Sequence, residues 1–173
     1  MTEPSKRVRE ITLRFLAAPT DINIYGKVHG GAVMKWMDEA GYVCAAGWSG
    51  YPCATVYVGG IRFYKPIHIG NIVEVHAQLI YTGRTSMHIA VNVRSGDPKD
   101  RQFIPTTHCV IVFVALDEKG IPLEVPEWVP HAEDDKSLKS YAERLVEFGK
   151  QLEGEMRPYL NQTAKAEHEY GAR

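Results

Sequence analysis

The sequence lacks the motifs that mark several large enzyme classes. Its 173 residues contain no GxGxxG loop, no Walker-type phosphate loop, no GxSxG nucleophile elbow, no HExxH helix and no CxxC pair. Each of these motifs supplies a specific geometry for a dinucleotide, a phosphate, an acyl group or a zinc ion. Dinucleotide, phosphate-loop, serine-hydrolase and zinc chemistry therefore have no support in the sequence.

Net charge and cysteine content are also low. The 20 Lys and Arg nearly balance the 21 Asp and Glu, and the basic residues are scattered, so we expect no nucleic-acid partner. The three cysteines, Cys44, Cys53 and Cys109, are odd in number and lack metal-type spacing, which favours reduced core thiols. No apolar run reaches membrane-spanning length, and the first ten residues lack the apolar core of a signal peptide. We therefore expect a cytoplasmic protein with no membrane partner.

Histidines do not form a metal motif either. Four of them fall on predicted strands: His68, His76, His88 and His108. A site could be assembled from them across strands, but histidines on an exposed sheet face are the simpler interpretation. The sequence therefore predicts no metal.

One apolar segment, residues 29–48, dominates what the sequence does contain. It begins at a glycine pair, is apolar on nearly every face and includes a single acidic pair, Asp38 and Glu39. A helix that is apolar all round is typical of a buried helix, where a carboxylate is costly unless it is paired, hydrogen-bonded or used. Asp38 is therefore the first candidate for chemistry.

The start of this helix is a second candidate site. Gly30 and Gly31 leave the first N–H groups uncovered by side chains, and the helix dipole favours a carbonyl or anionic oxygen there. Gly31 and Asp38 lie about 10 Å apart along the helix axis, too far to contact one reacting carbonyl. If both act on one atom, they come from two chains. The alternative, a solvated carboxylate after an ordinary tight turn, stays open on the helix alone.

The rest of the sequence predicts an α+β fold. Alternating apolar residues indicate strands at 8–15, 53–67, 69–81, 86–95 and 106–117, the third and fourth forming a hairpin. A bulge or bend is expected to interrupt the second strand at Gly59 and Gly60. One strand, a long apolar helix and four more strands are most simply arranged as a curved antiparallel sheet that wraps the helix. Its edge strand favours pairing between two copies of the chain.

The composition changes after Gly120. Residues 121–130 contain three prolines, and an amphipathic helix with an acidic start follows. Its apolar residues are Leu138, Tyr141, Leu145, Phe148 and Leu152. We expect packing or oligomer contacts from this helix, and a frayed polar tail from Asn161. The chain thus divides into a domain of residues 1–130 and a C-terminal helical extension of residues 131–173.

Two places could hold a phosphate. The turn TGRTSM places Arg84 between two strands with Thr85 and Ser86 beside it, and Lys65 precedes Pro66 at a strand end. Arginine with neighbouring hydroxyls suits a phosphate through charge-assisted hydrogen bonds. The alternative is an ordinary hairpin tip.

Three stretches together resemble a known family. They are DINIYGKVHGGAVMKWMDEAG, FYKPI with the GN that follows it, and GRTSM. They are similar to the acyl-CoA thioester hydrolases of the hotdog fold, in the subgroup of bacterial and cytosolic mammalian acyl-CoA hydrolases. The resemblance extends over residues 8–130, and VPEWVPHAEDDK is similar to the sequence after the last strand of the cytosolic enzymes. It implies a hotdog fold, with the sheet around one long central helix and two protomers joined edge to edge.

The resemblance also implies a site and a reaction. Asn23 and Asp38 match the two catalytic positions, with Asn23 near the helix mouth of one protomer and Asp38 from the other. Gly31 would offer its N–H to the thioester oxygen, and Lys65, Arg84 and Ser86 would hold coenzyme A. The reaction is hydrolysis of acyl-CoA to free CoA and a carboxylic acid, with no cofactor. Asp38 would act as general base on water or as a nucleophile through an anhydride. The expected assembly is a homodimer that forms a trimer of dimers.

Two other functions stay open at this point. A hotdog hydratase or dehydratase would pair a histidine with the carboxylate, and His29 is the residue that could supply it. A non-enzymatic acyl-CoA or nucleotide-binding module would keep the Arg84 pocket without depending on Asp38.

Overall fold

The computed structural model describes residues 7–100 and 102–170, with the backbone alone for residues 162–170. In this part of the chain the elements are β1 (Glu10–Leu16), the short 3-10 helix η1 (Pro19–Asp21), α1 (Gly30–Ser49), β2 (Cys53–Phe63), β3 (Ile72–Thr82), β4 (Ser86–Gly96), β5 (Ile104–Ala115) and α2 (Glu133–Tyr170). The predicted order of one strand, a helix, four strands and a final helix is confirmed. The start of the chain, where the sequence predicts no signal peptide, lies partly outside the described residues.

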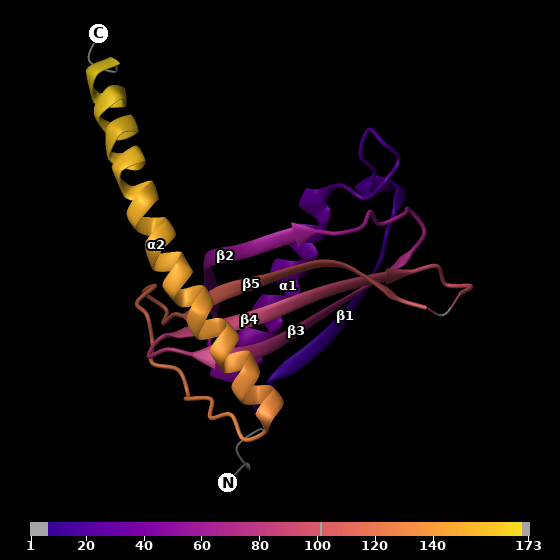
Figure 1. Cartoon of the computed structure of the whole chain (residues 1–173), viewed down its shortest axis with the longest axis horizontal. Helices are drawn as coiled ribbons and strands as arrows, with labels where there is room; N and C mark the ends of the chain where they lie inside the picture. The colour runs from indigo at the N-terminus through magenta and orange to yellow at the C-terminus, as the bar shows by residue number, and fades with distance from the viewer. Residues whose placement is uncertain (1–6, 101, 171–173) are drawn as a thin grey trace.

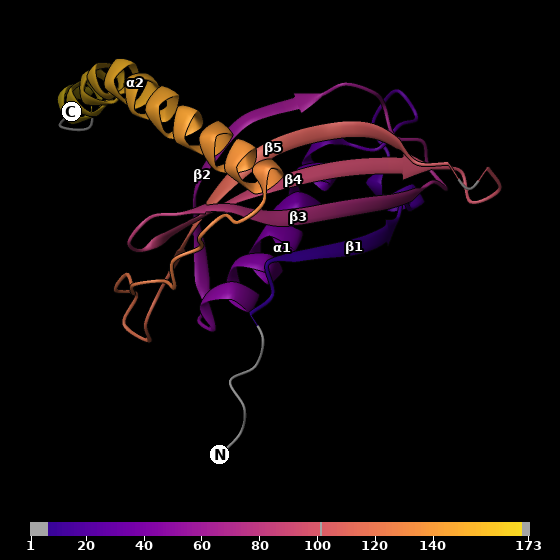
Figure 2. The same ribbon diagram turned by 60° about the horizontal axis from the view of Figure 1, so that its bottom comes forward.

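The five strands form one antiparallel sheet in the order β1-β3-β4-β5-β2. α1 lies against the inner, concave face of this sheet and α2 crosses its outer face (Figure 1, Figure 2). The predicted break in β2 is confirmed, because the register with β5 shifts between Gly59 and Arg62 and Gly60 has a φ of 63°. This is the α+β hotdog architecture, with β1 and β2 as the edge strands.

The core lies between the inner face of the sheet and α1. The predicted inward residues of the central strands are all buried: Val73, Val75, Ala77, Leu79, Met87, Ile89, Val91 and Val93. Period-2 alternation places these side chains on one face, where burial of their apolar area stabilises the fold. Gly41 lets the helix approach closely, because a Cβ there would lie 2.7 Å from the Phe113 ring.

α1 is buried on one side only, and this corrects the expectation of a helix buried all round. Trp36, Met37 and Cys44 face the sheet, but Met34, Asp38 and Tyr42 are exposed in the single chain. A five-stranded sheet covers one side of a helix, and the edge strand β2 leaves the flank with Asp38 open. Asp38 is therefore an exposed carboxylate beside an edge strand, and not a buried one.

α2 covers the outer face of the sheet. Ala142 is fully buried against Ile80, Ala90 and Val110, and the predicted packing residues Leu138, Tyr141 and Leu145 join this cluster. The helix also buries His88, so the expectation of an exposed histidine is wrong there; His108 is half-buried. None of the helices in the described residues is long and apolar enough to cross a membrane.

α2 is longer than the sequence predicts. It continues through Pro158 to Tyr170 where a frayed tail was expected from Asn161, and residues 171–173 lie outside the described part. The Ala, Lys and Glu residues of this end are strong helix formers, which favours propagation of the helix. Phe148 and Leu152, expected to pack, are exposed.

Candidate active site

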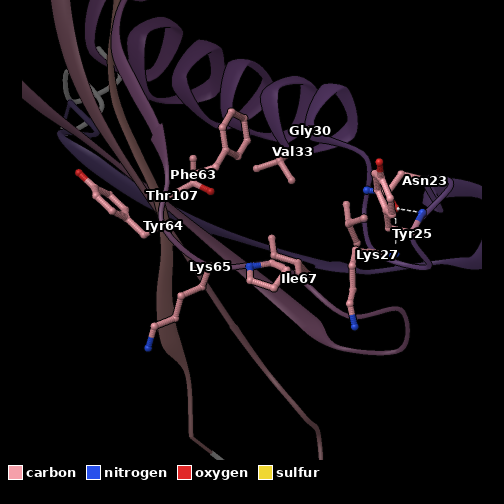
Figure 3. A pocket seen from close by; sticks show the side chains of 12 residues that line it. Asn23, Tyr25, Lys27, Gly30, Val33, Phe63, Tyr64, Lys65, Ile67 and Thr107 are labelled. Carbon is pink, nitrogen blue, oxygen red and sulfur yellow. Dashed lines mark hydrogen bonds between the residues drawn. The ribbon is translucent and has the colours of Figure 1, made fainter.

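A pocket of about 380 Å³ opens at the N-terminal end of α1. Its wall comes from the loop after η1, the first turn of α1, the end of β2 with the residues after it, and Thr107 on β5 (Figure 3). Most lining side chains are apolar, while Asn23 and Gly30 lie at one end of the pocket (Figure 3). Such an apolar cleft with a few convergent polar groups is the usual form of a small-molecule site.

Asn23 is held rigidly at the rim of this pocket. Its side-chain Oδ1 accepts hydrogen bonds from the backbone N–H groups of Tyr25 and Lys27, at 2.9 and 3.1 Å. An asparagine that caps its own turn in this way has one fixed orientation. Because the oxygen accepts from the loop, the Nδ2 amide is the end that can donate to a bound carbonyl.

The mouth of α1 is capped by a side chain. His29 is the N-cap residue, and its Nδ1 accepts the Gly31 N–H at 2.9 Å. The Gly31 N–H is therefore a hydrogen-bond donor at the start of the helix, as predicted, but it already donates to the imidazole nitrogen of His29. His29 contacts Gly31 at the start of α1, whereas Asp38 is near the middle of the helix, so the structure does not pair the two within one chain.

Asp38 has a partner that the sequence did not reveal. The Thr55 hydroxyl, on β2, donates a hydrogen bond of 2.6 Å to Asp38 Oδ1. A short hydrogen bond to an ionised acceptor fixes the orientation of the carboxylate. The one available signal was a polar residue inside an apolar strand, CATVYV, but strand and helix periodicity do not say which residues meet across the two elements.

The two candidate groups lie far apart within one chain. Thr107, in the pocket, pairs with Phe63, whereas Thr55 pairs with Phe113 six residues further along β5. Six residues of strand span about 20 Å. Thr55, the partner of Asp38, and the Asn23 pocket are thus at different ends of the inner face, and the helical spacing of Gly31 and Asp38 separates the two candidate groups in the same way.

The three residues expected to bind coenzyme A are also divided between these ends. Lys65 lines the Asn23 pocket, with its ammonium pointing out of it (Figure 3). Ser86 pairs with Val114 and lies with Arg84 at the Asp38 end. Arg84 makes an exposed ion pair of 3.3 Å with Glu124, which is weak enough to exchange for another anion.

Two buried thiols are not alternative nucleophiles. Burial raises the pKa of Cys44 and of Cys109 to about 12, so neither thiol forms a thiolate near neutral pH. No group of three His, Cys, Asp or Glu side chains is placed to hold a metal ion in that part of the chain. Asp38, an exposed carboxylate held by the Thr55 hydroxyl, remains the acid–base candidate of this site.

Comparison with known proteins agrees with this architecture. The family model of the thioesterase superfamily matches residues 25–101. An uncharacterised acyl-CoA thioester hydrolase of Buchnera aphidicola subsp. Schizaphis graminum is 35% identical over 66% of this chain and 87% of its own length.

Solved structures give the same result. An acyl-CoA hydrolase from Staphylococcus aureus, in complex with butyryl coenzyme A and coenzyme A, matches with a TM-score of 0.82 at 27% identity, over 90% of this chain and 94% of that one. Three further structures are alanine variants of that enzyme at an asparagine, an aspartate and a threonine. A hexameric thioesterase from Yersinia pestis matches with a TM-score of 0.63 at 34% identity, over 67% of this chain and 94% of that one.

Proposed function

This chain belongs to the thioesterase superfamily, among the acyl-CoA thioester hydrolases, and we propose that it hydrolyses acyl-CoA to CoA and a carboxylic acid at a site shared by two copies. The observation that carries this proposal is the Asp38–Thr55 hydrogen bond on the open flank of α1. It presents an oriented carboxylate beside an edge strand, about 10 Å along the helix axis from Gly31 at the mouth of the pocket that contains Asn23.

The positions of three residues support this assignment. In the Staphylococcus aureus enzyme, the substituted aspartate follows the substituted asparagine by 15 positions, and the threonine follows the aspartate by 17. The same intervals separate Asn23, Asp38 and Thr55 in this sequence. We infer that these three residues have the corresponding places in this site, which adds Thr55 to the residues expected from the sequence.

In the proposed reaction Asp38 acts as general base. It takes a proton from water while the water oxygen attacks the thioester carbon, and the C=O electrons move onto the oxygen. Asn23 Nδ2 and the Gly31 N–H stabilise that oxyanion. Collapse of the intermediate breaks the C–S bond, and the proton held by Asp38 passes to the departing thiolate of CoA. The alternative is direct attack by Asp38, which gives an anhydride that water then cleaves.

His29 has a defined place in this scheme. Its Nδ1 occupies the Gly31 N–H, so the thioester oxygen would replace the imidazole nitrogen when substrate binds. The exchange substitutes one acceptor for another at the same donor, and the N–H is thus satisfied in both states. Rotation of the exposed His29 side chain is sufficient for this exchange.

The edge strand β2 explains how two distant ends become one site. Pairing of β2 with the β2 strand of a second copy about a two-fold axis makes the strands antiparallel. The Asn23 end of one protomer then lies beside the Asp38 end of its partner, and two equivalent sites form. Met34 and Tyr42, exposed on either side of Asp38, would be covered in this arrangement.

The proposed assembly goes one step further, to a trimer of such dimers. The Yersinia pestis thioesterase that matches this chain is described as hexameric. In each shared site, Arg84 and Ser86 from the Asp38 end and Lys65 from the Asn23 end are proposed to bind the phosphates of coenzyme A. Their separation within a single chain is consistent with a substrate that extends across the dimer.

Mixed dimers test the shared site. Asn23→Ala and Asp38→Ala proteins should each be inactive in a free-thiol release assay with a panel of acyl-CoA substrates. In a mixed dimer one site contains both substitutions and the other contains neither. Random exchange should therefore restore about a quarter of wild-type activity, and purification through two different tags should raise this to about one half.

Two outcomes would contradict the proposal. Verified mixed dimers with no activity above the single variants would mean that both residues act within one chain. A wild-type protein that releases no thiol from any acyl-CoA, yet binds these compounds, would instead support a binding module.

A further inference from the structure

α2 is much longer than the sheet that it covers. Near its start, Asp135 forms an ion pair with Arg9, just before β1. Two turns later Tyr141 hydrogen-bonds to His108 on β5, and Gly149 lies beside the ring of Tyr57 on β2. The helix thus crosses the strands toward the β2 edge, and its last 21 residues, 150–170, project past that edge (Figure 1, Figure 2).

The apolar face of α2 continues from the first half of the helix into the projecting half. Phe148, Leu152 and Met156 follow one another at intervals of four, so they share one side of the helix. Their exposed fractions are 61%, 49% and 51%. Leu138 and Leu145 on the same helix pack on the sheet, but these three extend the stripe into solvent. A row of large exposed apolar side chains marks an interaction surface.

The same edge of the molecule has a second unfilled apolar surface. Val56, on the outer side of β2, is 58% exposed. Together with Val112 on β5 and the stripe on α2 it lines a groove of about 720 Å³. The stripe, the groove and the unpaired backbone groups of β2 therefore all lie at one edge, and one partner could cover all three.

We propose that the occupant of this surface is a second copy of the chain. The inference rests on the β2 pairing of the proposed function: once two β2 strands pair, the sheet continues beyond the edge over which α2 projects. The distal half of each α2 then lies over the outer face of its partner, with the stripe against the partner's β2 groove. The contact is reciprocal, as two-fold symmetry requires.

The dimensions fit this arrangement. The 21 projecting residues are about 32 Å long as a helix. Five paired strands of a partner sheet span about 24 Å. The projecting half of α2 is thus long enough to reach across the partner. We call this arrangement a clasp: residues 150–170 of each chain pack over the outer face of the other chain.

A charge placed in the stripe tests the contact. The double substitution Leu152→Glu and Met156→Glu should raise the dissociation constant of the dimer by about tenfold or more, because two apolar contacts are lost. Gly154→Glu is the control: it adds one of these negative charges on the opposite side of the helix, where a Cβ meets open space, and should change nothing. Sedimentation equilibrium gives the constants, and circular dichroism confirms that each variant is folded.

Cross-linking identifies the partner surface directly. One chain with Leu152→Cys and a tag, and a second chain with Val56→Cys and no tag, are mixed and treated with a bismaleimide. The docking predicts a product that contains both chains and is absent from either variant alone. Mixing single variants excludes a link within one chain.

Three results would overturn the clasp. They are unchanged association of the double Glu variant, cross-linking only when both cysteines are in one chain, and a monomeric wild-type protein that binds lipid vesicles through the stripe. Thiol release measured on the same samples separates this inference from the proposed function. Activity without the cross-link refutes only the clasp, and inactivity of the wild-type protein refutes the function whatever the cross-link shows.

Discussion

The two faces of the sheet hold their polar groups in opposite ways. On the inner side, Asp38 lies exposed on the flank of α1 and has the Thr55 hydroxyl as its partner. On the outer side, α2 buries His88 and half-buries His108, which hydrogen-bonds to Asn92 and Tyr141. Since Asn92 Oδ1 is an acceptor, His108 Nδ1 holds the proton and Nε2 accepts from the Tyr141 hydroxyl.

The difference shows where chemistry is available in this fold. Burial lowers the pKa of His88 to about 4 and lowers that of His108, so both are neutral and structural near pH 7. The Asp38 carboxylate is exposed and is oriented by the Thr55 hydroxyl. The proposed general base therefore lies at an open edge of the inner face, and the closed outer face contributes stability.

The largest expected effect comes from the inner carboxylate. Asp38→Asn should lower kcat by about a thousandfold or more, because the amide is nearly isosteric but cannot accept a proton from water. Glu39→Gln is the control, since Glu39 only pairs with Lys35 on the same helix and should stay within about twofold. Near-normal kcat of Asp38→Asn on every acyl-CoA would remove this residue from the mechanism.

Thr55 should have the next largest effect. Thr55→Val keeps the shape of the side chain but removes the hydrogen bond to Asp38. It should lower kcat by about 10- to 100-fold, because this factor corresponds to the free energy of a hydrogen bond to a charged group. Thr55→Ser, which retains the hydroxyl, should recover most of the activity. Equal activity of the valine and serine variants would show that packing, and not the hydroxyl, matters at this position.

The outer face should respond to pH in stability. Between pH 6.5 and 4 the unfolded chain binds a proton that folded His88 does not, so the free energy of unfolding falls as the pH falls through this range. From pH 8 to pH 5 the loss due to His88 is about 2 kcal/mol. His88→Gln should abolish this part of the pH dependence of the free energy of unfolding, measured by urea denaturation. The free energy of unfolding of this variant at pH 8 separately gives the loss of packing that the substitution causes. An unchanged slope would mean that His88 is protonated in the folded state.

The smallest effect is expected at Arg84, at the Asp38 end of the sheet. Arg84→Ala should raise KM for acyl-CoA by about tenfold with little change in kcat, and should not matter for an acyl-pantetheine that lacks the nucleotide. Glu124→Ala frees the guanidinium and should not raise KM. Equal losses on both substrates would count against a phosphate contact.

Local pattern was enough to predict most of the fold. The buried faces of β3, β4 and β5 follow from period-2 alternation, which depends only on neighbouring residues. The start of α1 after His29 and the bend of β2 at the glycine pair are local too. The position of Asn23 at the mouth of α1 came from its loop and from the family motif.

Two expectations failed for one physical reason. The helix α1 was expected to be buried on every side and is exposed at Asp38, and His88 was expected to be exposed and is buried. Periodicity shows which side chains share a face, but not which faces another element will cover. The amphipathic pattern of α2 predicted a helix, yet did not show that it would lie on the outer face of the sheet.

The sequence by itself determined the elements, their inward faces and the candidate residues Gly31 and Asp38, because these depend on spacing along the chain, and its resemblance to a family added Asn23. Only the tertiary structure decided that Thr55 hydrogen-bonds to Asp38 and that the Asn23 pocket lies at the far end of the sheet. It also decided that α2 projects past β2. These facts depend on the register and direction in which distant segments pack, and no local pattern encodes that information.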